Sequence, residues 1–331
     1  MDDASAYRDA GVDLAAADDA LAGIREAVAS TYDERVLAGL GSFGGLFALT
    51  DLPRQPVLVA STDGVGTKTR VATAVDRLDG LGEDLVNHCL NDILVQGARP
   101  LFFLDYVASS RLQPQQVAAV VSGAARACRQ AGMPLLGGET AEMPGVYAEG
   151  ELDLVGTIVG IVGRGDVVDG SRVRPGDRIL ALAASGLHTN GFSLARKILA
   201  DRYHDEFENG TVADALLAPH RSYLAAVEPL LGLVRGMVHV TGGGIPGNLP
   251  RVLPQGSGAR IELGSWPVPA IFELIAQTGE VARSEMHRVF NMGAGYLLIV
   301  APEHVEEVRE LCPEPVWLVG TVEEGQGVAL V

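Results

Sequence analysis

Short apolar runs alternate along this chain with segments whose apolar residues recur at helical spacing. Mostly apolar runs at 57–60, 101–108 and 152–163 predict strands that are largely buried. Between them, apolar residues recur every three or four positions over 83–96, and Pro114 opens a second helical pattern that ends at about residue 131. Strand–helix–strand alternation of this kind favours an α/β arrangement.

Two of these segments carry polar groups that the apolar pattern does not explain. The strand predicted over 101–108 is apolar except for Asp105. The helix predicted over 83–96 has one apolar face, and polar residues lie on its other side: Asp84, Asn87, His88, Asn91 and Asp92. A polar helix face is usually solvated, by roughly two to one, so this pattern alone favours a surface role.

The length of the chain predicts two domains. It has 331 residues, and a typical domain has about 100–200. The segment 163–177 concentrates Gly, Asp and Arg between two predicted strands, which is typical of a linker. We therefore expect an amino-terminal domain over 1–168 and a carboxy-terminal domain over 169–331.

Charge and cysteine content exclude several classes of function. A formal net charge of −17 argues against nucleic acid and against anionic membrane surfaces, both of which attract basic proteins. No apolar stretch approaches the roughly 20 residues that span a bilayer, and the acidic first residues do not have the form of a signal peptide. The three cysteines are widely spaced, which argues against a disulfide framework or a thiolate zinc site. We expect a cytoplasmic protein.

The stretch "TDGVGTK", residues 62–68, follows the first predicted strand and combines glycines with an acid and a lysine. Gly64 and Gly66 allow the backbone to approach a ligand and to direct N–H groups at an anion. Lys68 supplies a positive charge, and Asp63 offers a carboxylate oxygen to Mg²⁺. The spacing is not that of a Walker A loop. A tight turn with a surface lysine explains the motif about equally well.

Further acids could complete such a metal site. Asp92, with Asn91 beside it, would be a second carboxylate, and Mg²⁺ on a nucleotide typically takes one or two carboxylates. The loop "GGETAEMPGVY", residues 137–147, follows a short predicted strand and contains Glu139. This glutamate could ligate a metal, hold a ribose hydroxyl or act as a base. A helix cap or turn is the simpler alternative, at roughly one in three.

Two glycine turns in the second half precede predicted helices, whose amino termini favour phosphate. They are "SGLHTNGFS" at 185–193 and "HVTGGGIPGN" at 239–248. His188 and His239 lie in these turns, and each has about even odds of being only a hydrogen-bonded structural residue. The remaining histidines considered lie in ordinary helical or polar stretches and receive no assignment: His204, His220 and His304.

Seven strings resemble one known family. They are "YRDAGVD", "TDGVGTK", "NDILVQGARPLFFLDY", "GGETAEMPGVY", "GLHTNGFSLARKIL", "HVTGGGIPGNLPRVLP" and "FNMGAGY". In this order they are similar to the phosphoribosylformylglycinamidine cyclo-ligases, also called aminoimidazole ribonucleotide synthetases. The resemblance runs nearly end to end. One departure is the pair Arg25 and Glu26, where the family often has a lysine.

The resemblance implies a two-domain α/β fold with a mixed sheet in the amino-terminal domain, which pairs with its dimer mate into a barrel, and an α/β carboxy-terminal domain. It implies ATP-driven closure of formylglycinamidine ribonucleotide to aminoimidazole ribonucleotide in purine biosynthesis, with Mg²⁺ and a homodimer. ATP phosphorylates the amide oxygen, and the amidine nitrogen then attacks that carbon and expels phosphate. The enzyme must align these groups and exclude water.

The resemblance also implies site residues. The metal would be held by Asp63 and Asp92. ATP would be bound by these two acids and by Gly64, Gly66, Thr67, Lys68, Asn91, Gly137, Gly138, Glu139 and Thr140. The substrate would contact Gly186, His188, Thr189, Asn190, Gly191, Thr241, Gly242, Gly243 and Gly244. Proton transfer would fall to His188, His239 or Glu139, because ring closure releases a proton.

Other enzymes with related motifs are the alternatives. They are selenophosphate synthetase, thiamine-monophosphate kinase, the hydrogenase-maturation dehydratase and the glutamine-dependent amidotransferase of purine synthesis. The first usually needs a reactive cysteine before Cys89, and the third a cysteine-containing tail, whereas this chain ends "GQGVALV". A non-catalytic nucleotide-binding subunit is a further alternative. A dinucleotide oxidoreductase is disfavoured because no G-x-G-x-x-G opens the first strand–helix unit.

Overall fold

The computed structural model describes residues 14–331, so the motif "YRDAGVD" at 7–13 lies outside the described residues. The described chain forms two compact units. The first contains the described residues up to Ile93 together with Arg99–Ile161. The second contains Leu94–Ala98 and Val162–Val331. Each unit has a sheet of its own and is described by itself.

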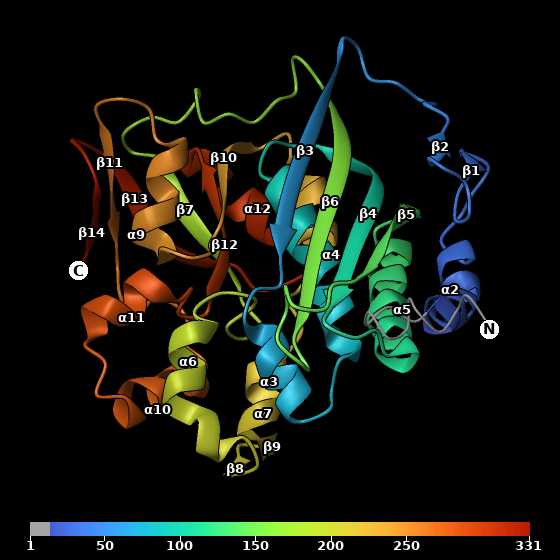
Figure 1. Ribbon diagram of the computed structural model, residues 1–331. Helices are drawn as coiled ribbons and strands as arrows, with labels where there is room; N and C mark the ends of the chain where they lie inside the picture. Colours follow the sequence, from blue (N-terminus) through green and yellow to red (C-terminus); the bar gives the residue numbers. More distant parts are fainter. Residues whose placement is uncertain (1–13) are drawn as a thin grey trace, which may run out of the picture. The chain divides into compact units, whose positions relative to one another are not determined.

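The first unit is built on a four-stranded mixed sheet with the strand order β3-β6-β4-β5 (Figure 1). The strands are β3 (Pro56–Gly64), β6 (Leu152–Gly163), β4 (Arg99–Ser109) and β5 (Leu135–Glu142). Strand β4 pairs antiparallel with β6 and parallel with β5. Consequently β3 and β5 lie at opposite edges of the sheet, which decides which candidate residues can meet.

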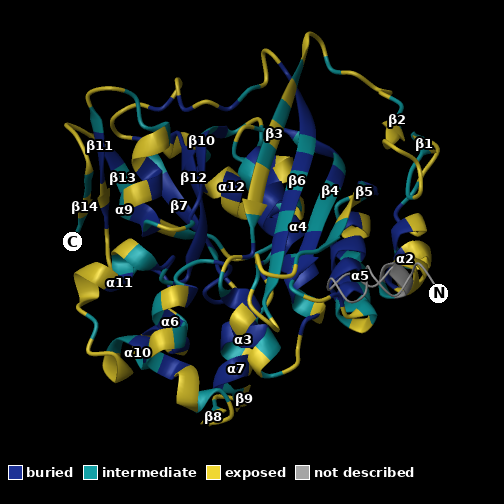
Figure 2. Cartoon of the chain, in the orientation of Figure 1, coloured by how far each residue is buried: buried dark blue, intermediate teal, exposed yellow. Residues whose placement is uncertain are grey.

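Helices accompany this sheet, and a short hairpin precedes it. They are α2 (Leu14–Ala29), α3 (Lys68–Ala74), α4 (Asp79–Leu94) and α5 (Pro114–Gln130), with the hairpin strands β1 (Val36–Ala38) and β2 (Leu46–Phe47). Helices α4 and α5 pack closely at two glycines: a Cβ on Gly82 would lie 1.9 Å from the carbonyl oxygen of Val120, and one on Gly123 would lie 2.3 Å from that of Asp79. Most of α4 is buried (Figure 2).

The second unit contains a six-stranded sheet with the order β10-β12-β7-β13-β11-β14. Its strands are β7 (Arg178–Ala183), β10 (Val234–His239), β11 (Ser257–Ile261), β12 (Ala294–Val300), β13 (Trp317–Glu324) and β14 (Val328–Leu330). Neighbouring strands run antiparallel except for β11 and β14. Alternate residues of β7 enter different cores, Ile179 one and Leu180 the other, so this sheet is buried on both faces. Each fully buried aliphatic side chain contributes about 1.5–3 kcal/mol.

The helices and small strands of the second unit are short. They are α6 (Phe192–Leu199), α7 (Val212–Leu217), α8 (Leu224–Val227), α9 (Gly244–Asn248), α10 (Ala270–Thr278), α11 (Arg283–Val289), α12 (Val305–Leu311), β8 (Glu206–Phe207) and β9 (Gly210–Thr211). Four 3-10 turns accompany them: η1 (Ala200–Arg202), η2 (Glu228–Leu230), η3 (Leu249–Val252) and η4 (Pro302–His304). No helix among residues 14–331 combines the length and apolar character that crossing a bilayer requires.

The pattern-based predictions of elements hold closely where the period was clear. The strand predicted over 152–163 is β6, and the helix predicted from Pro114 is α5. The helix predicted over 83–96 begins earlier, at Asp79, and ends at Leu94. The main sheet of each unit contains both parallel and antiparallel strand pairs, so each of these sheets is mixed.

Candidate functional site

Two of the predicted metal-binding acids meet in the first unit. Asp63 lies near the end of β3, and Asp92 lies in the last turn of α4. The hydroxyl of Ser61 on β3 donates a hydrogen bond to Asp92 Oδ2 at 2.9 Å. His88 Nε2 lies 3.0 Å from Asp63 Oδ2 and 3.9 Å from Asp92 Oδ2. The end of β3 and the last turns of α4 therefore hold two carboxylates around one imidazole.

The polar face of α4 is buried, which corrects the expectation that it is solvated. Asp84 and Asn91 are 0% exposed, and Asn87 and His88 are 4% exposed. Burying charged and amide groups is unfavourable unless they find partners, so a helix face of this kind is maintained by specific contacts. The apolar face of the same helix is buried as well, and α4 therefore lies within the unit with polar groups on one of its sides.

His88 is electrostatically matched to the two acids. Burial of its imidazole works against the charged form, but the hydrogen bond with Asp63 and the charges of Asp92 and Asp63 outweigh it, so the pKa of His88 is raised. The same attraction works in both directions, so the protonated form of His88 favours the ionised form of the two carboxylates. The sequence showed His88 only as one of several polar helix residues, and its i, i+4 spacing to Asp92 was the signal available.

Lys68 is fully buried in an ion pair. Its Nζ lies 2.8 Å from Asp84 Oδ1 and 2.8 Å from Asp84 Oδ2, and both side chains are 0% exposed. Burial lowers the pKa of the Lys68 ammonium, and the negative charge of Asp84 opposes that shift. The alternative of a surface lysine is thus wrong. The ammonium that the motif supplies is directed at α4, and it fixes the start of α3 to that helix.

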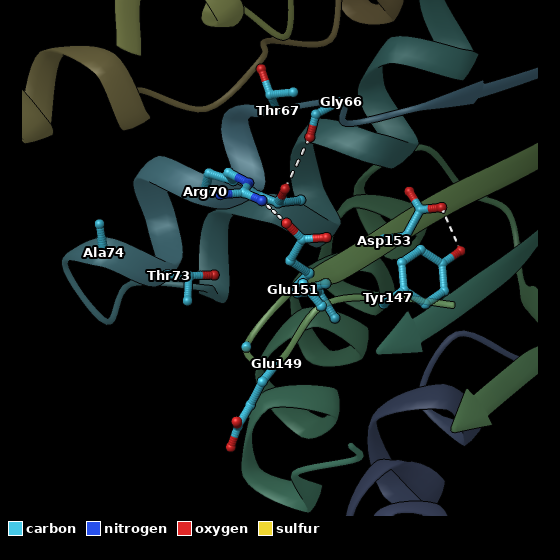
Figure 3. Close-up of a pocket in the computed structure, with 13 residues that line it drawn as sticks. Gly66, Thr67, Arg70, Thr73, Ala74, Tyr147, Glu149, Glu151 and Asp153 are labelled. Carbon is cyan, nitrogen blue, oxygen red and sulfur yellow. Dashed lines mark hydrogen bonds and ion pairs between the residues drawn. The ribbon is translucent and has the colours of Figure 1, made fainter. Parts of the chain in front are cut away.

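The glycine turn itself borders a hollow of about 640 Å³ (Figure 3). Gly66 adopts φ +63°, a left-handed conformation that favours glycine, and together with Thr67 it lines this hollow. Arg70 on α3 faces the same space and forms an ion pair with Glu151. An exposed guanidinium beside a glycine turn is a strong phosphate ligand. Arg70 stands two residues after Lys68, just beyond the motif at 62–68, and the sequence pattern did not mark it.

Glu139 lies elsewhere in the unit. It is exposed on β5, at the sheet edge opposite Asp63, three strand spacings or roughly 14 Å away. Its Oε1 accepts a hydrogen bond from the backbone N–H of Thr140 at 2.9 Å. Within one chain, the structure therefore brings Asp63 and Asp92 together but not Glu139.

Glu139 instead borders a second cavity, of about 130 Å³. Its walls are mainly apolar, with Gly137, Gly138 and Thr140 from β5. Asp105 is the other acid in the wall, and burial raises its pKa to about 7. A Cβ on Gly138 would lie 2.1 Å from Asp105 Oδ1, so glycine is required for this close approach. A lone acid in an otherwise apolar strand was the sequence signal for this pocket.

The Asp63–Asp92 pair fits the chemistry of Mg²⁺. Carboxylate oxygens are the ligands this hard cation prefers. The side chains are 48% and 27% exposed, so a metal ion could reach both. The hydrogen bonds from Ser61 to Asp92 and from the backbone N–H of Gly64 to Asp63, at 2.9 and 2.7 Å, orient the two carboxylates.

In the second unit the two predicted substrate turns lie against each other. Asn190 Oδ1 is 3.2 Å from the position that a Cβ on Gly242 would occupy. Asn248 donates from Nδ2 to the carbonyl of Gly244 at 2.8 Å, which fixes the second turn. Asn291 donates to the carbonyl of Gly186 at 2.9 Å, which fixes the first. These amides make the turns rigid, as a preorganised ligand site requires.

Three buried histidines lie beside these turns. His188, His220 and His239 are 1%, 0% and 6% exposed. The Nε2 atoms of His220 and His239 are hydrogen-bonded at 3.0 Å, and the rings of His188 and His220 stack with centroids 4.0 Å apart. Sequence analysis assigned nothing to His220, because the contact depends on residues from three separate segments. The residues next to His220 in the sequence, such as Pro219, form no motif that would have marked it as a site residue.

The chain matches two family descriptions that together span most of its length. Residues 44–162 match "AIR synthase related protein, N-terminal domain", and residues 174–331 match the C-terminal domain of the same description. The protein therefore belongs to the AIR synthase related family.

Individual relatives within that family are closely similar over almost the whole chain. A phosphoribosylformylglycinamidine cyclo-ligase of Anaeromyxobacter dehalogenans (strain 2CP-C) is 52% identical over 330 residues, which covers 96% of each chain. One from Myxococcus xanthus (strain DK1622) is 50% identical over 335 residues, covering 98% of this chain and 97% of the relative. One from Desulfitobacterium hafniense (strain DSM 10664 / DCB-2) is 50% identical over 311 residues, covering 92% and 91%.

Solved structures of more distant proteins share the fold. Thiamine-monophosphate kinase from Stenotrophomonas maltophilia K279a aligns with a TM-score of 0.71 at 18% identity, covering 93% of this chain and 95% of the other. Hydrogenase maturation protein HypE in complex with ATP aligns with a TM-score of 0.66 at 21% identity, covering 91% and 85%. At these identities the likeness establishes the fold alone.

Proposed function

We propose that this protein is an ATP-dependent cyclo-ligase of purine biosynthesis. It converts formylglycinamidine ribonucleotide to aminoimidazole ribonucleotide and releases ADP and phosphate. The observation that carries the proposal is the 52% identity over 96% of the chain to a phosphoribosylformylglycinamidine cyclo-ligase. The geometry within each unit supports it, because the first offers acids and glycines for a nucleotide and the second offers rigid turns with imidazoles.

In this proposal the first unit binds ATP. Gly66 and Thr67 direct backbone groups at the triphosphate from the wall of the hollow, Gly64 precedes them at the end of β3, and Arg70 adds a positive charge beside them. Lys68 acts indirectly, since its ion pair with Asp84 holds α3 against α4. The buried Asn91 precedes Asp92 on the same helix and belongs to the same proposed site.

Mg²⁺ held by Asp63 and Asp92 would neutralise charge on the transferred phosphoryl group. His88 contacts both carboxylates and Ser61 donates a hydrogen bond to Asp92, and these contacts orient the two acids. The apolar cavity beside Asp105 suits a flat, mostly apolar ring such as the base, and Gly137, Gly138, Glu139 and Thr140 line it. ATP phosphorylates the substrate amide, because an amide oxygen is by itself a poor leaving group.

The second unit binds formylglycinamidine ribonucleotide. The turns Gly186–Gly191 and Thr241–Gly244 contribute His188, Thr189 and Asn190 and the backbone of Gly242 and Gly243. The Asn190 Nδ2 atom is buried and makes no hydrogen bond within the described residues, as expected of a group that awaits a ligand. His239 and His188 are the candidates that accept the proton released on ring closure.

The proposed assembly is a homodimer formed through the first unit, and the proposed location is the cytoplasm. Large apolar side chains are exposed in this unit: Phe43 and Leu46 in the β1–β2 hairpin, Leu49 and Leu52 in the segment that follows it, and Leu58 on the edge strand β3. Exposed apolar side chains gathered in one unit are typical of an interaction surface. In a dimer, Glu139 of one protomer and Asp63 of its partner could serve one site.

Leu58→Asp tests the dimer. Its side chain is 61% exposed, so the substitution spares the monomer core. Light scattering after gel filtration should show the wild type at twice the mass of the variant. A wild-type protein that stays at 34.6 kDa would contradict the proposed assembly.

The activity is tested by mixing purified protein with ATP, Mg²⁺ and formylglycinamidine ribonucleotide. We expect equimolar ADP and aminoimidazole ribonucleotide, with the aminoimidazole followed by a colorimetric amine assay. Omitting Mg²⁺ should stop the formation of both products. Hydrolysis of ATP without aminoimidazole, or no reaction with this substrate at all, would reject the proposal.

A further inference from the structure

His220 joins the two histidines that the substrate turns contribute. Its Nε2 is 3.0 Å from His239 Nε2, and its Nδ1 is 3.3 Å from Thr189 Oγ1. Its ring stacks on that of His188 with an interplanar angle of 16°. A nitrogen–nitrogen hydrogen bond needs one proton between the two rings, so His220 and His239 cannot choose their tautomers independently.

The same three rings do not form a good metal site. Their nitrogens lie within 4.8 Å of one another, which is close enough for a shared ion. However, imidazole binds a metal through a lone pair in the plane of its ring. Two nearly parallel rings with centroids 4.0 Å apart direct their lone pairs along parallel lines, so His188 and His220 do not converge on one point. The arrangement favours protons over metal.

His188 is the ring that stays neutral. Its Nε2 accepts a hydrogen bond from the backbone N–H of Ser185 at 3.3 Å, which requires an unprotonated nitrogen there. It is also stacked on His220, and two stacked imidazolium rings would repel. A proton that enters the cluster is therefore held by His239 and His220.

We propose that His220 is a positioning residue for ring closure, which shares one proton with His239 and takes up the positive charge when His239 accepts the proton released by the substrate. Before the step, His239 carries its proton on Nε2 and His220 on Nδ1. The N–H bond of the attacking nitrogen breaks and a bond forms to His239 Nδ1. The Nε2 proton moves to His220 Nε2, and His220 Nδ1–H donates to Thr189 Oγ1. The inference rests on the proposed function.

The other groups of the second unit around this pair are already engaged. The phenol of Tyr223 donates to the carbonyl of Ala183 at 2.7 Å, and burial raises its pKa. Tyr296 lies with its ring 6.4 Å from that of His239. Arg221, next in sequence, forms an ion pair with Glu314 at 2.6 Å and lies over Tyr223. Within this unit, the two imidazoles are thus the groups best able to exchange a proton near neutral pH.

The direct test uses the wild-type protein without substrate. With ¹⁵N-labelled histidine, NMR should detect a coupling across the hydrogen bond between the Nε2 atoms of His220 and His239. Titration should show these two rings changing together in two coupled steps, while His188 stays neutral. Independent single-step titrations without the coupling would overturn the proposal, whether or not the protein closes the imidazole ring.

Two variants of His220 test the proposal by steady-state kinetics. His220→Phe keeps a flat ring for stacking and removes both nitrogens, and His220→Gln keeps hydrogen bonding but cannot take up a proton. We expect kcat to fall about tenfold or more in both, less than the roughly 10²–10⁴-fold loss of a general base itself, with KM for the substrate nearly unchanged. The acid limb of the pH–rate profile should shift in both variants. The exposed His204, changed to Phe, is the matched control, and this variant should alter neither kcat nor the pH–rate profile.

The outcomes separate this inference from the proposed function. If the wild type forms no aminoimidazole ribonucleotide, the proposed function fails, and the NMR titration still tests the shared proton. If the wild type is active and both variants keep its kcat and pH–rate profile, His220 has no part in the proton transfer. Loss of activity on removal of a bound zinc ion would also overturn the proposal, in favour of a metal site.

Discussion

The two units bury polar groups in opposite ways. The first places acid–base pairs along α4, a fully buried one of Lys68 with Asp84 and a partly exposed one of His88 with Asp63. The second, beside its glycine turns, buries imidazoles and amides, of which His220 and His239 are hydrogen-bonded to each other and Asn248 to a backbone carbonyl. Charged networks suit a metal and a triphosphate, whereas neutral groups suit an amide substrate and a mobile proton. The division of labour proposed above follows from this difference.

The largest expected effect comes from removing one charge of the acidic pair. Asp92→Asn keeps the size of the side chain and its place beside Ser61, but halves the carboxylate ligands available to Mg²⁺. We expect turnover to fall below roughly 10⁻⁴ of the wild type, with an unchanged circular dichroism spectrum. Exposed Asp76, changed to Asn, is the control. Near-normal turnover would remove Asp92 from the metal site.

The next effect concerns stability. Lys68→Met leaves Asp84 buried without its ion pair, which should lower the free energy of unfolding by about 3–5 kcal/mol. The double variant Lys68→Met, Asp84→Leu should recover most of the loss, because two apolar groups replace the pair. Urea unfolding followed by circular dichroism measures both. Equal stability of the single variant and the wild type would show that the pair is not important for the fold.

The neutral cluster should respond in rate rather than in stability. His239→Gln retains a hydrogen-bonding side chain but removes the base, so kcat should fall by roughly 10²–10³-fold while KM for ATP changes little. Steady-state assays at saturating Mg²⁺ measure both constants. A large rise in KM for ATP with normal kcat would mean that this cluster serves the nucleotide, and the contrast between the units would disappear.

The smallest effect is a pH dependence in the first unit. Burial raises the pKa of Asp105 to about 7 from 3.8, so between about pH 4 and 7 the folded protein binds a proton that the unfolded chain has released. Stability should therefore fall as pH rises through that window, by on the order of 2–4 kcal/mol relative to Asp105→Asn. Urea titrations at several pH values compare this variant with the exposed control Asp166→Asn. Parallel curves would show that Asp105 ionises normally.

Local pattern was informative where one period covered a whole element. The mostly apolar run at 152–163 and the proline-opened helix at 114 became β6 and α5, because a period that is clear over a whole element fixes the type of that element. The motif strings likewise placed the glycine turns and their histidines, since left-handed turns need glycine at particular positions. The main error was the expectation that the polar face of α4 is solvated. The period of the sequence shows which residues share a face, but it does not show what covers that face.

By itself, the sequence determined the strand–helix alternation, the glycine turns and the resemblance from which the chemistry was inferred, because these depend on neighbouring residues. Tertiary structure alone decided which side chains meet. Strand order separated Glu139 from Asp63 within one chain, packing turned Lys68 inward to Asp84, and three distant segments brought His188, His220 and His239 together. Such contacts arise only when the chain closes on itself, since their energies depend on burial and distance rather than on sequence spacing.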